Sequence, residues 1–174
     1  MKTIIFMVMS LNAKIANADG TYPWASKKDW ESFQAQYKKA GCIIIGKNTY
    51  DKLRNKSSFP TKGCTCVVMS NNKTFTSDHP KVIVTHDSPI DILNMLEKKG
   101  FKQVLIGGGG EINSLFMKQG LIDEVYIDIE PVVVGQGIPL FADGDLKARL
   151  ILLGMKKLTN RQTIQLHYRV LNSY

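Results

Sequence analysis

The chain has 174 residues, of which 44% are hydrophobic and 22% charged, a composition typical of one globular domain spanning residues 1–174. No apolar run approaches the roughly 20 residues of a membrane span, and the polar residues Ser10, Asn12 and Lys14 interrupt the apolar N-terminal stretch too early for a signal peptide. The net charge of +8 is scattered without an aromatic-basic motif, so we expect an anionic small molecule as partner, with no nucleic acid and no membrane.

The three cysteines, Cys42, Cys64 and Cys66, are odd in number and lack zinc-site spacing, because only one residue separates the last two. This pattern predicts reduced thiols in a cytoplasmic protein.

The first quarter of the chain predicts a strand, a polar loop and a helix. Thr3–Met9 is almost continuously apolar, as expected for a strand covered on both faces. The loop Ser10–Gly20 ends in an Asp-Gly turn signal, with Ile15 and Ala16 returning towards the core. Ser26 is suited to cap a helix over Lys27–Lys39.

Two further apolar segments of the next quarter, Gly41–Gly46 and Thr65–Ser70, predict buried strands, and Val82–Thr85 predicts a short one. Pro89–Lys99 predicts a helix because its apolar residues recur at helical spacing. The residues expected to face inward are Ile92, Leu93 and Leu96.

The third quarter contains a strand, four consecutive glycines and a helix. Val104–Ile106 is short and rich in β-branched residues, which favours a strand. Glu111–Lys118 predicts a helix that turns one apolar face inward. That face consists of Ile112, Leu115 and Phe116.

The remainder of the chain predicts three strands and a loop. Val125–Ile129 is expected to be a strand, and Pro131–Phe141 a loop with apolar anchors. Arg149–Leu158 and Thr163–Leu171 are expected to pair antiparallel through a turn at Thr159–Arg161. Strands that alternate with helices predict an α/β fold of three layers around a mainly parallel sheet.

The glycine stretch, Gly107 to Gly110, joins the predicted strand to the predicted helix. Glycine backbone can approach a ligand closely, and the free N–H groups at a helix N-terminus suit a phosphate. The alternative interpretation is a tight turn, which requires only one glycine. The stretch is neither a Walker motif nor a GxGxxG motif, so the residues leave the ligand open.

Polar residues also follow other predicted strands, at Ser10, Gly46–Thr49 and Ser70–Asn72. Ligands of open α/β sheets bind beyond the carboxyl ends of the strands, so we expect these segments and the glycines to form one groove. The cations Lys47 and Lys73 and the polar groups of these segments would suit a dinucleotide with an extra phosphate.

Asp29 is the leading candidate for a catalytic carboxylate. It lies near a predicted helix N-terminus, beside Trp24, Trp30 and Phe33, where partial burial would raise its pKa. It could bind an amidine-like ring edge through paired hydrogen bonds. The alternative role, a carboxylate that complements the helix dipole, is equally compatible with the sequence.

Six segments, taken together and in order, resemble the dihydrofolate reductase superfamily, and the distal half is most similar to the reductase domain of riboflavin biosynthesis. The segments are SLNAKIA, YPWASKKDWESF, IGKNTY, VMSNN, IGGGGEINSLF and GLIDEVYIDIEPVVVGQGIPLF. The resemblance spans residues 3–141. It implies a mainly parallel sheet of about eight strands and reduction, by NADPH, of a pterin- or pyrimidine-like small molecule.

The resemblance also implies roles for individual residues. Asp29 would be catalytic with Lys14 in contact with substrate, and Trp24, Phe33 and Asp128 would belong to the substrate pocket. The expected cofactor-binding residues are Ser10, Gly46, Lys47, Thr49, Ser70, Asn71, Ile106, Gly107, Gly108, Gly109, Gly110, Glu111 and Ile112. Relatives of this branch commonly dimerise, and the apolar edge near Ile164 and Leu166 is compatible with a homodimer.

Five residues depart from the family pattern. Asn12-Ala13 replaces Asp-Gly, and Ile106 replaces a glutamate, which weakens the case for a phosphoribosyl pyrimidine substrate. Asp128 stands where dihydrofolate reductases have a threonine bonded to the catalytic acid, so it either points elsewhere or forms a different pocket. Lys47 in place of arginine predicts weaker 2′-phosphate discrimination. A true dihydrofolate reductase and a non-catalytic nucleotide-binding protein therefore remain as alternative functions.

Overall fold

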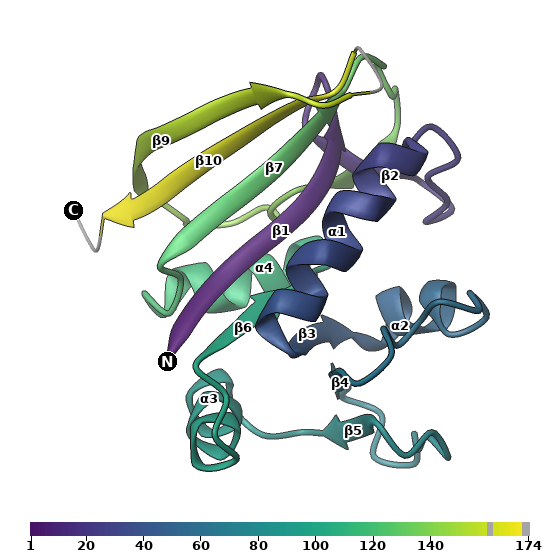
Figure 1. Ribbon diagram of the computed structural model, residues 1–174, viewed down its shortest axis with the longest axis vertical. Helices are drawn as coiled ribbons and strands as arrows, with labels where there is room; N and C mark the ends of the chain where they lie inside the picture. Colours follow the sequence, from purple (N-terminus) through teal and green to yellow (C-terminus); the bar gives the residue numbers. More distant parts are fainter. Residues whose placement is uncertain (160–161, 172–174) are drawn as a thin grey trace.

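Eight strands form the central sheet (Figure 1). The computed structural model describes residues 1–159 and 162–171. In the spatial order given next, the first six strands run parallel to one another, and the last two run antiparallel to their neighbours. Their spatial order is β5 (Val82–Thr85), β4 (Thr65–Met69), β3 (Cys42–Gly46), β6 (Gln103–Ile106), β1 (Lys2–Ser10), β7 (Glu124–Glu130), β10 (Ile164–Leu171) and β9 (Arg149–Lys157).

Helices cover both faces of this sheet, which confirms the three-layer α/β prediction (Figure 1). On one face α1 (Lys27–Ala40) and α2 (Lys47–Leu53) pack through Tyr37, Tyr50 and Leu53. On the other face lie α3 (Pro89–Lys98) and α4 (Gly110–Lys118). Their core residues are Ile92, Leu93, Leu96, Phe116 and Met117.

The central strands are apolar on both faces because successive side chains point to opposite layers. Along β3, Ile43 and Ile45 pack under α1 and α2, whereas Ile44 packs against α3 and α4. Ile4 and Ile5 of β1 divide in the same way. Continuous burial explains why these strands read as unbroken apolar runs.

Side-chain caps define where α1 and α3 begin. The Oγ of Ser26 accepts a hydrogen bond from the Asp29 N–H, and Ser88 does the same for Asp91. Gly41 ends α1 with a φ of 74°, a left-handed conformation that favours glycine. The predicted Ser26 cap is therefore confirmed, and the bounds of both helices agree with the prediction to within one residue.

Two elements differ from the sequence-based expectation. Residues Pro131–Phe141 were expected to form a loop, but they contain β8 (Gly137–Pro139), which pairs antiparallel with β2 (Lys14–Asn17). Lys47 and its neighbours, for which no helix was predicted, form α2. Both elements are short, and β8 exists only through a pairing partner distant in sequence.

The apolar pattern of α4 was also partly misassigned. Phe116 is fully buried as predicted, but Leu115 is 36% exposed and the helix instead buries Asn113, Ser114 and Met117. The sheet edge is β9 rather than the segment near Ile164 and Leu166, because these residues lie in β10. The predicted turn Thr159–Arg161 includes residues 160–161, which lie outside the described residues.

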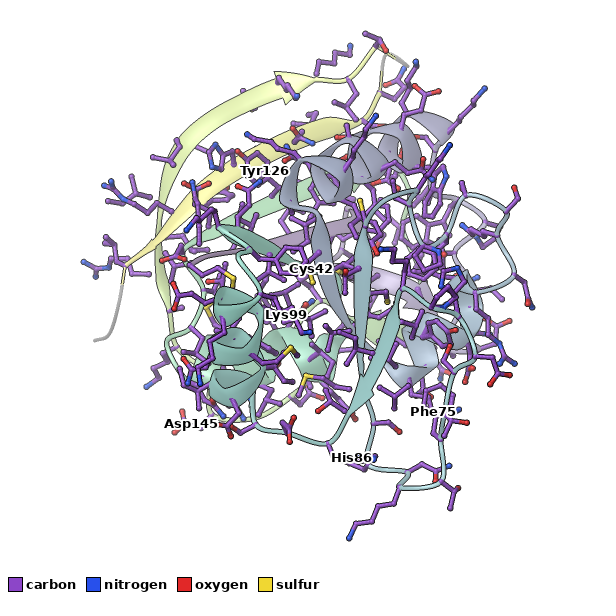
Figure 2. All side chains as sticks on the ribbon, turned by 60° about the horizontal axis from the view of Figure 1, so that its bottom comes forward. Cys42, Phe75, His86, Lys99, Tyr126 and Asp145 are labelled. Carbon is purple, nitrogen blue, oxygen red and sulfur yellow. The ribbon has the colours of Figure 1, made fainter. Side chains whose placement is uncertain are left out.

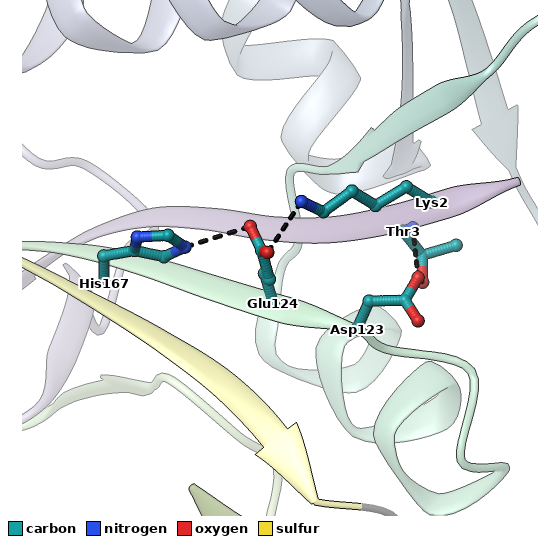
Figure 3. Close-up of polar contacts among 5 residues, drawn as sticks. All are labelled: Lys2, Thr3, Asp123, Glu124 and His167. Carbon is teal, nitrogen blue, oxygen red and sulfur yellow. Dashed lines mark hydrogen bonds and ion pairs between the residues drawn. The ribbon is translucent and has the colours of Figure 1, made fainter. Parts of the chain in front are cut away.

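Polar contacts join the amino ends of β1 and β7 (Figure 3). Oδ2 of Asp123 accepts hydrogen bonds from the backbone N–H and the hydroxyl of Thr3, at 2.7 and 3.0 Å. Glu124 bridges Lys2 at 2.6 Å and His167 of β10 at 2.9 Å. These contacts therefore align β1, β7 and β10 at the end of the sheet opposite its carboxyl edge.

The three cysteines are free and buried, as the sequence predicts. Figure 2 shows Cys42 inside the molecule, and burial raises the pKa of the Cys42 and Cys66 thiols. Within residues 1–159 and 162–171, no helix has the length and apolar character required to cross a bilayer.

Candidate active-site groove

A groove of about 1140 Å³ runs along the carboxyl edge of the sheet. It is lined by the ends of β3 and β4, by the glycine stretch after β6 and by the first turns of α1. The segments that the sequence placed together, Gly46–Thr49, Ser70–Asn72 and the glycines, do therefore meet in one groove. Asp29 lines the same groove.

The glycine stretch requires glycine at more than one position. A Cβ on Gly107 would lie 2.6 Å from the Ile43 side chain, and one on Gly110 would lie 2.6 Å from the Pro139 carbonyl oxygen. Gly109 is the N-cap of α4 and lines the groove, and no side chain caps the helix there. Unlike α1 and α3, α4 thus directs uncapped N–H groups towards the groove, which suits an anionic ligand.

The turn after β3 packs directly on the glycine stretch. The Gly46 N–H donates to the Gly108 carbonyl at 2.8 Å, and Thr49 Oγ1 would lie 3.7 Å from a Cβ on Gly109. Lys47 also lines the groove, with its ammonium group 5.1 Å from the centre of the Phe75 ring. The Thr49 hydroxyl therefore lies beside the uncapped helix terminus, and Lys47 adds a cation to the same groove.

The ends of β4 and β5 form the outer part of the groove. Ser70 is buried, and its Oγ accepts a hydrogen bond from the Asn72 N–H at 3.1 Å. The carbonyl of Ser70 contacts Nδ1 of His86, a residue at the periphery of the molecule (Figure 2). His86 and the α3 cap Ser88 line the groove, although the sequence analysis did not select them.

The inner part of the groove is aromatic and contains one carboxyl group. Trp30 and Phe33 of α1 stack with ring centroids 5.2 Å apart, and Lys56 lies 4.2 Å from the centre of the Trp30 ring. Both rings line the groove and are half-buried, because they also pack against the core. Asp29 lies beside them and is 5% exposed.

Behind Asp29 lie two more buried acids, Asp128 and Glu130 of β7. Burial raises the pKa of Asp29, and the adjacent Asp128 carboxyl raises it further. Burial also raises the pKa of Asp128, although the Gln165 hydrogen bond opposes this. The Asp128 carboxyl therefore acts on Asp29, while its Oδ1 accepts a hydrogen bond from Gln165 Nε2 at 2.7 Å.

Several predicted site residues do not line the groove. The Ser10 hydroxyl donates to Asn12 and accepts from the Lys14 N–H, so it organises its own loop. The Lys14 side chain begins on β2, next to Gly137, and Trp24 donates from Nε1 to Asn17 at 3.3 Å. The predicted site residues that do not line the groove are Ser10, Lys14, Trp24, Ile106, Gly108 and Asp128. The other predicted site residues line it.

Asn12, one of the departures from the family pattern, has a structural role. Its amide donates to the Val134 carbonyl at 2.7 Å and its Oδ1 accepts from the Val134 N–H at 3.0 Å. An aspartate could make only the second of these bonds. The Asn12 side chain thus anchors the first loop to the segment before β8.

Further lining residues carried no chemical signal in the sequence. Tyr22 stands in a motif that was interpreted through Asp29 and Phe33, Lys52 lies in no motif, and the β8 region was expected to be a plain loop. The residues not anticipated include Tyr22, Lys52, Leu53, His86, Ser88, Leu115, Ile138, Ala142 and Asp143.

Comparisons with known proteins agree with this arrangement. A family model described as "RibD C-terminal domain" matches residues 1–164. "Uncharacterized protein YwjB" of Bacillus subtilis (strain 168) is 30% identical over 171 residues, covering 96% of this chain and 97% of that protein. A 2,5-diamino-6-ribosylamino-4(3H)-pyrimidinone 5′-phosphate reductase of Aquifex aeolicus (strain VF5) is 32% identical over 84 residues, 46% of this chain and 34% of that protein.

Solved structures share the fold over nearly the whole chain. A Shewanella sp. PV-4 protein, provisionally described as a riboflavin biosynthesis protein, superposes with a TM-score of 0.84 and 26% identity, covering 99% of this chain and 100% of that one. Dihydrofolate reductase from Enterococcus faecalis, complexed with NADP(H), superposes with a TM-score of 0.75 and 14% identity over 99% and 97% of the two chains.

Proposed function

The chain belongs to the RibD C-terminal domain family, a family of reductases, and on that premise we propose that it is an NADPH-dependent reductase. The proposed substrate is a pyrimidine- or pterin-like small molecule, and the reaction is of the 5-amino-6-(5-phosphoribosylamino)uracil reductase type. One observation carries the proposal. A single groove contains both the uncapped α4 terminus, with its glycines, and the buried acid Asp29.

The outer half of the groove fits the cofactor. The uncapped N–H groups at Gly109 suit its pyrophosphate, while Lys47 and Ser70 are suited to the phosphate that distinguishes NADPH from NADH. When bound, NADPH would supply the hydride. The protein contributes the binding energy and holds the reacting rings in register.

The inner half of the groove fits a flat heterocycle. Trp30 and Phe33 offer apolar ring faces, and Asp29 is the titratable group beside them. The raised pKa of Asp29 suits a group that donates a proton near neutral pH. The catalytic role of Asp29 therefore has geometric support, whereas Lys14 remains a sequence-based prediction because its side chain is not among the lining groups.

Ligand linkage tests the cofactor assignment without requiring the substrate. NADPH should raise the melting temperature of the purified chain more than NADH at the same concentration, because ligands that bind the folded state stabilise it. No response to either nucleotide would contradict the proposal. Turnover is then assayed with an aminopyrimidine ribosyl phosphate and with dihydrofolate.

The second candidate is a dihydrofolate reductase, which is favoured by Asp29 and Phe33 lying in one groove as the family pattern implies. Turnover of dihydrofolate alone would favour it. Tight NADPH binding without turnover of any pterin or pyrimidine would instead indicate a non-catalytic nucleotide-binding protein.

The expected homodimer also remains a prediction. The exposed apolar residues of the sheet edge lie on β9, where Met155 is 69% and Leu152 53% exposed. Sedimentation velocity of the full chain measures the oligomeric state directly.

A further inference from the structure

Two buried carboxyl groups, those of Asp29 on α1 and Asp128 on β7, interact inside the protein, and the Asp128 carboxyl raises the pKa of Asp29. Each has a buried oxygen, Oδ1 of Asp29 and Oδ2 of Asp128, that receives no hydrogen bond from a donor among the described residues. Two carboxylates cannot bond to each other, because neither has a donor. The two carboxyl groups can therefore satisfy each other's orphaned oxygens only when one of the groups carries a proton.

We propose that Asp29 and Asp128 share one proton, and that Asp128 is the positioning residue that keeps Asp29 in its acid form towards the groove. This inference rests on the proposed function for its catalytic meaning, but the proton itself is a property of the ligand-free chain. It also assigns a role to Asp128, which departs from the pattern of the resembled reductases.

Gln165 holds Asp128 in place from the neighbouring strand. Gln165 of β10 lies opposite Asp128 in the antiparallel register, and its Nε2 donates to Asp128 Oδ1 at 2.7 Å. The same nitrogen lies 3.0 Å from the hydroxyl oxygen of Ser32 on α1. Ser32 and Asp29 are three residues apart and thus share one face of the helix. Asp128 is consequently held beneath the face that carries Asp29.

Glu130 is a third buried acid behind Asp29 and Asp128, but both of its carboxyl oxygens accept hydrogen bonds. Oε1 accepts from the Ser26 N–H at 3.0 Å, and Oε2 accepts from the Thr163 hydroxyl at 2.9 Å. Because Ser26 caps α1 at Asp29, Glu130 also fixes the start of the helix. A carboxylate held in this way makes loss of the shared proton less favourable.

Some of the surrounding groups raise the pKa values of Asp29 and Asp128, and others lower them. Burial and Glu130 raise the pKa of both Asp29 and Asp128. The Asp128 carboxyl raises the pKa of Asp29 further, whereas the interaction with Asp29 lowers the pKa of Asp128. Lys56, which follows α2, lowers the pKa of Asp29, and Lys156 of β9 lowers the pKa of Asp128. Burial is the largest influence at both groups, so the balance favours retention of one proton.

A shared proton changes what the groove recognises. A protonated Asp29 donates to an acceptor nitrogen or oxygen of the substrate, whereas a carboxylate would bind a cationic amidine edge. In the reaction the Asp29 O–H bond breaks and an N–H or O–H bond forms on the substrate. NADPH, when bound, would supply the hydride to the neighbouring carbon, so that the C=N or C=O bond would be reduced as the cofactor is oxidised. The remaining pair of carboxylates regains a proton from water.

NMR titration of the full chain without ligands tests the proposal directly. Aspartate carboxyl carbons are labelled, and assigned by comparing the wild type with Asp29→Asn and Asp128→Asn, from about pH 4 to about pH 9. The expected result is one carboxyl signal of the pair that stays protonated well above the ordinary aspartate range. A wild-type spectrum in which every aspartate carboxyl signal titrates in the ordinary range would overturn the proposal, and that outcome needs no assignment and therefore no folded variant.

Asp128→Asn supplies the second measurement. The variant removes a like charge and adds an amide donor, so the Asp29 midpoint should fall by about one pH unit or more. Asp145→Asn, the matched control at an exposed carboxylate outside the groove (Figure 2), should leave the midpoint unchanged. An unchanged Asp29 midpoint in Asp128→Asn would show that Asp128 does not hold the proton.

The pH profile of turnover separates this inference from the proposed function. With the reductase activity present, the alkaline decline of kcat should move to lower pH in Asp128→Asn, a shift that a merely structural role would not produce. If the chain holds the shared proton but lacks reductase activity, the proposed function is wrong and the proton-sharing pair of Asp29 and Asp128 stands. If the chain is an active reductase but Asp29 and Asp128 both titrate in the ordinary range, the shared proton is wrong and the proposed function stands.

Discussion

The ammonium group of Lys47 lies 2.6 Å from Oδ2 of Asp51, one turn later on α2. The cation expected to bind cofactor phosphate is thus already neutralised in part by a neighbouring carboxylate. Both side chains are about one-third exposed, so water screens the pair and the attraction between them is weak. Lys47 can therefore exchange Asp51 for a phosphate at little cost.

Replacing Lys47 tests this exchange. Lys47→Met should weaken NADPH binding roughly tenfold, since a charge-assisted hydrogen bond to phosphate is lost, and should weaken NADH binding less. Isothermal titration calorimetry with both nucleotides measures the ratio. Lys62→Met, which removes an exposed lysine outside the groove, is the control. An equal loss for both nucleotides would place Lys47 away from the distinguishing phosphate.

Asp29→Asn should lower turnover by roughly 100-fold, because the substrate would lose its proton donor. Binding of NADPH should remain, since Asp29 lies at the inner, aromatic part of the groove. Steady-state kinetics and calorimetry on the same preparation check both statements. Glu31→Gln, at an exposed carboxylate of the same helix that pairs with Lys28, should behave as the wild type. If turnover by Asp29→Asn were normal, the acid would have no catalytic role.

The Asp29 and Asp128 pair should make folding stability depend on pH. A raised pKa in the folded state means that the unfolded chain releases a proton that the folded chain retains, so the stabilisation is complete below about pH 4 and is lost as pH rises through the raised pKa. Asp128→Asn removes most of this dependence. Relative to the wild type, it should gain roughly 1–3 kcal/mol of unfolding free energy between acid and mildly alkaline pH.

Urea denaturation of both proteins at several pH values provides the measurement, with Asp145→Asn as the reference for loss of an exposed charge. A difference between Asp128→Asn and wild type that stays constant across the range would mean that the raised pKa values do not exist in the folded chain.

Gly110→Ala should destabilise the fold by roughly 1–3 kcal/mol, because its Cβ would press on a backbone carbonyl that cannot move freely. The predicted contact is 2.6 Å from the oxygen of Pro139. Gly135→Ala is the matched control, since a Cβ there meets nothing within 4 Å. Equal stability of the two variants, measured by denaturant unfolding, would show that the β8 segment does not pack on the glycine stretch as described.

Much of the fold could be predicted from local pattern. The runs at Ile43–Ile45 and Val67–Val68 are apolar because both faces of these strands are buried. Ser26 and Ser88 are residues of a type that caps helix N-termini, and each of them caps the helix that follows it. The groove was also foreseeable, because parallel strands direct their carboxyl ends to one edge. By contrast, α2 offered only Tyr50 and Leu53 as buried residues, too few to define a helical period.

The sequence by itself determined the layers, the order of the strand ends and the residue types available to bind an anion, since these follow from periodicity, capping and chain direction. Only the tertiary structure decided that Asp128 meets Asp29, because the register of β10 on β7 brings Gln165 opposite Asp128 and beneath α1. The pairing of β2 with β8 was decided in the same way. Contacts between segments distant in the chain depend on packing and register, which no local pattern encodes.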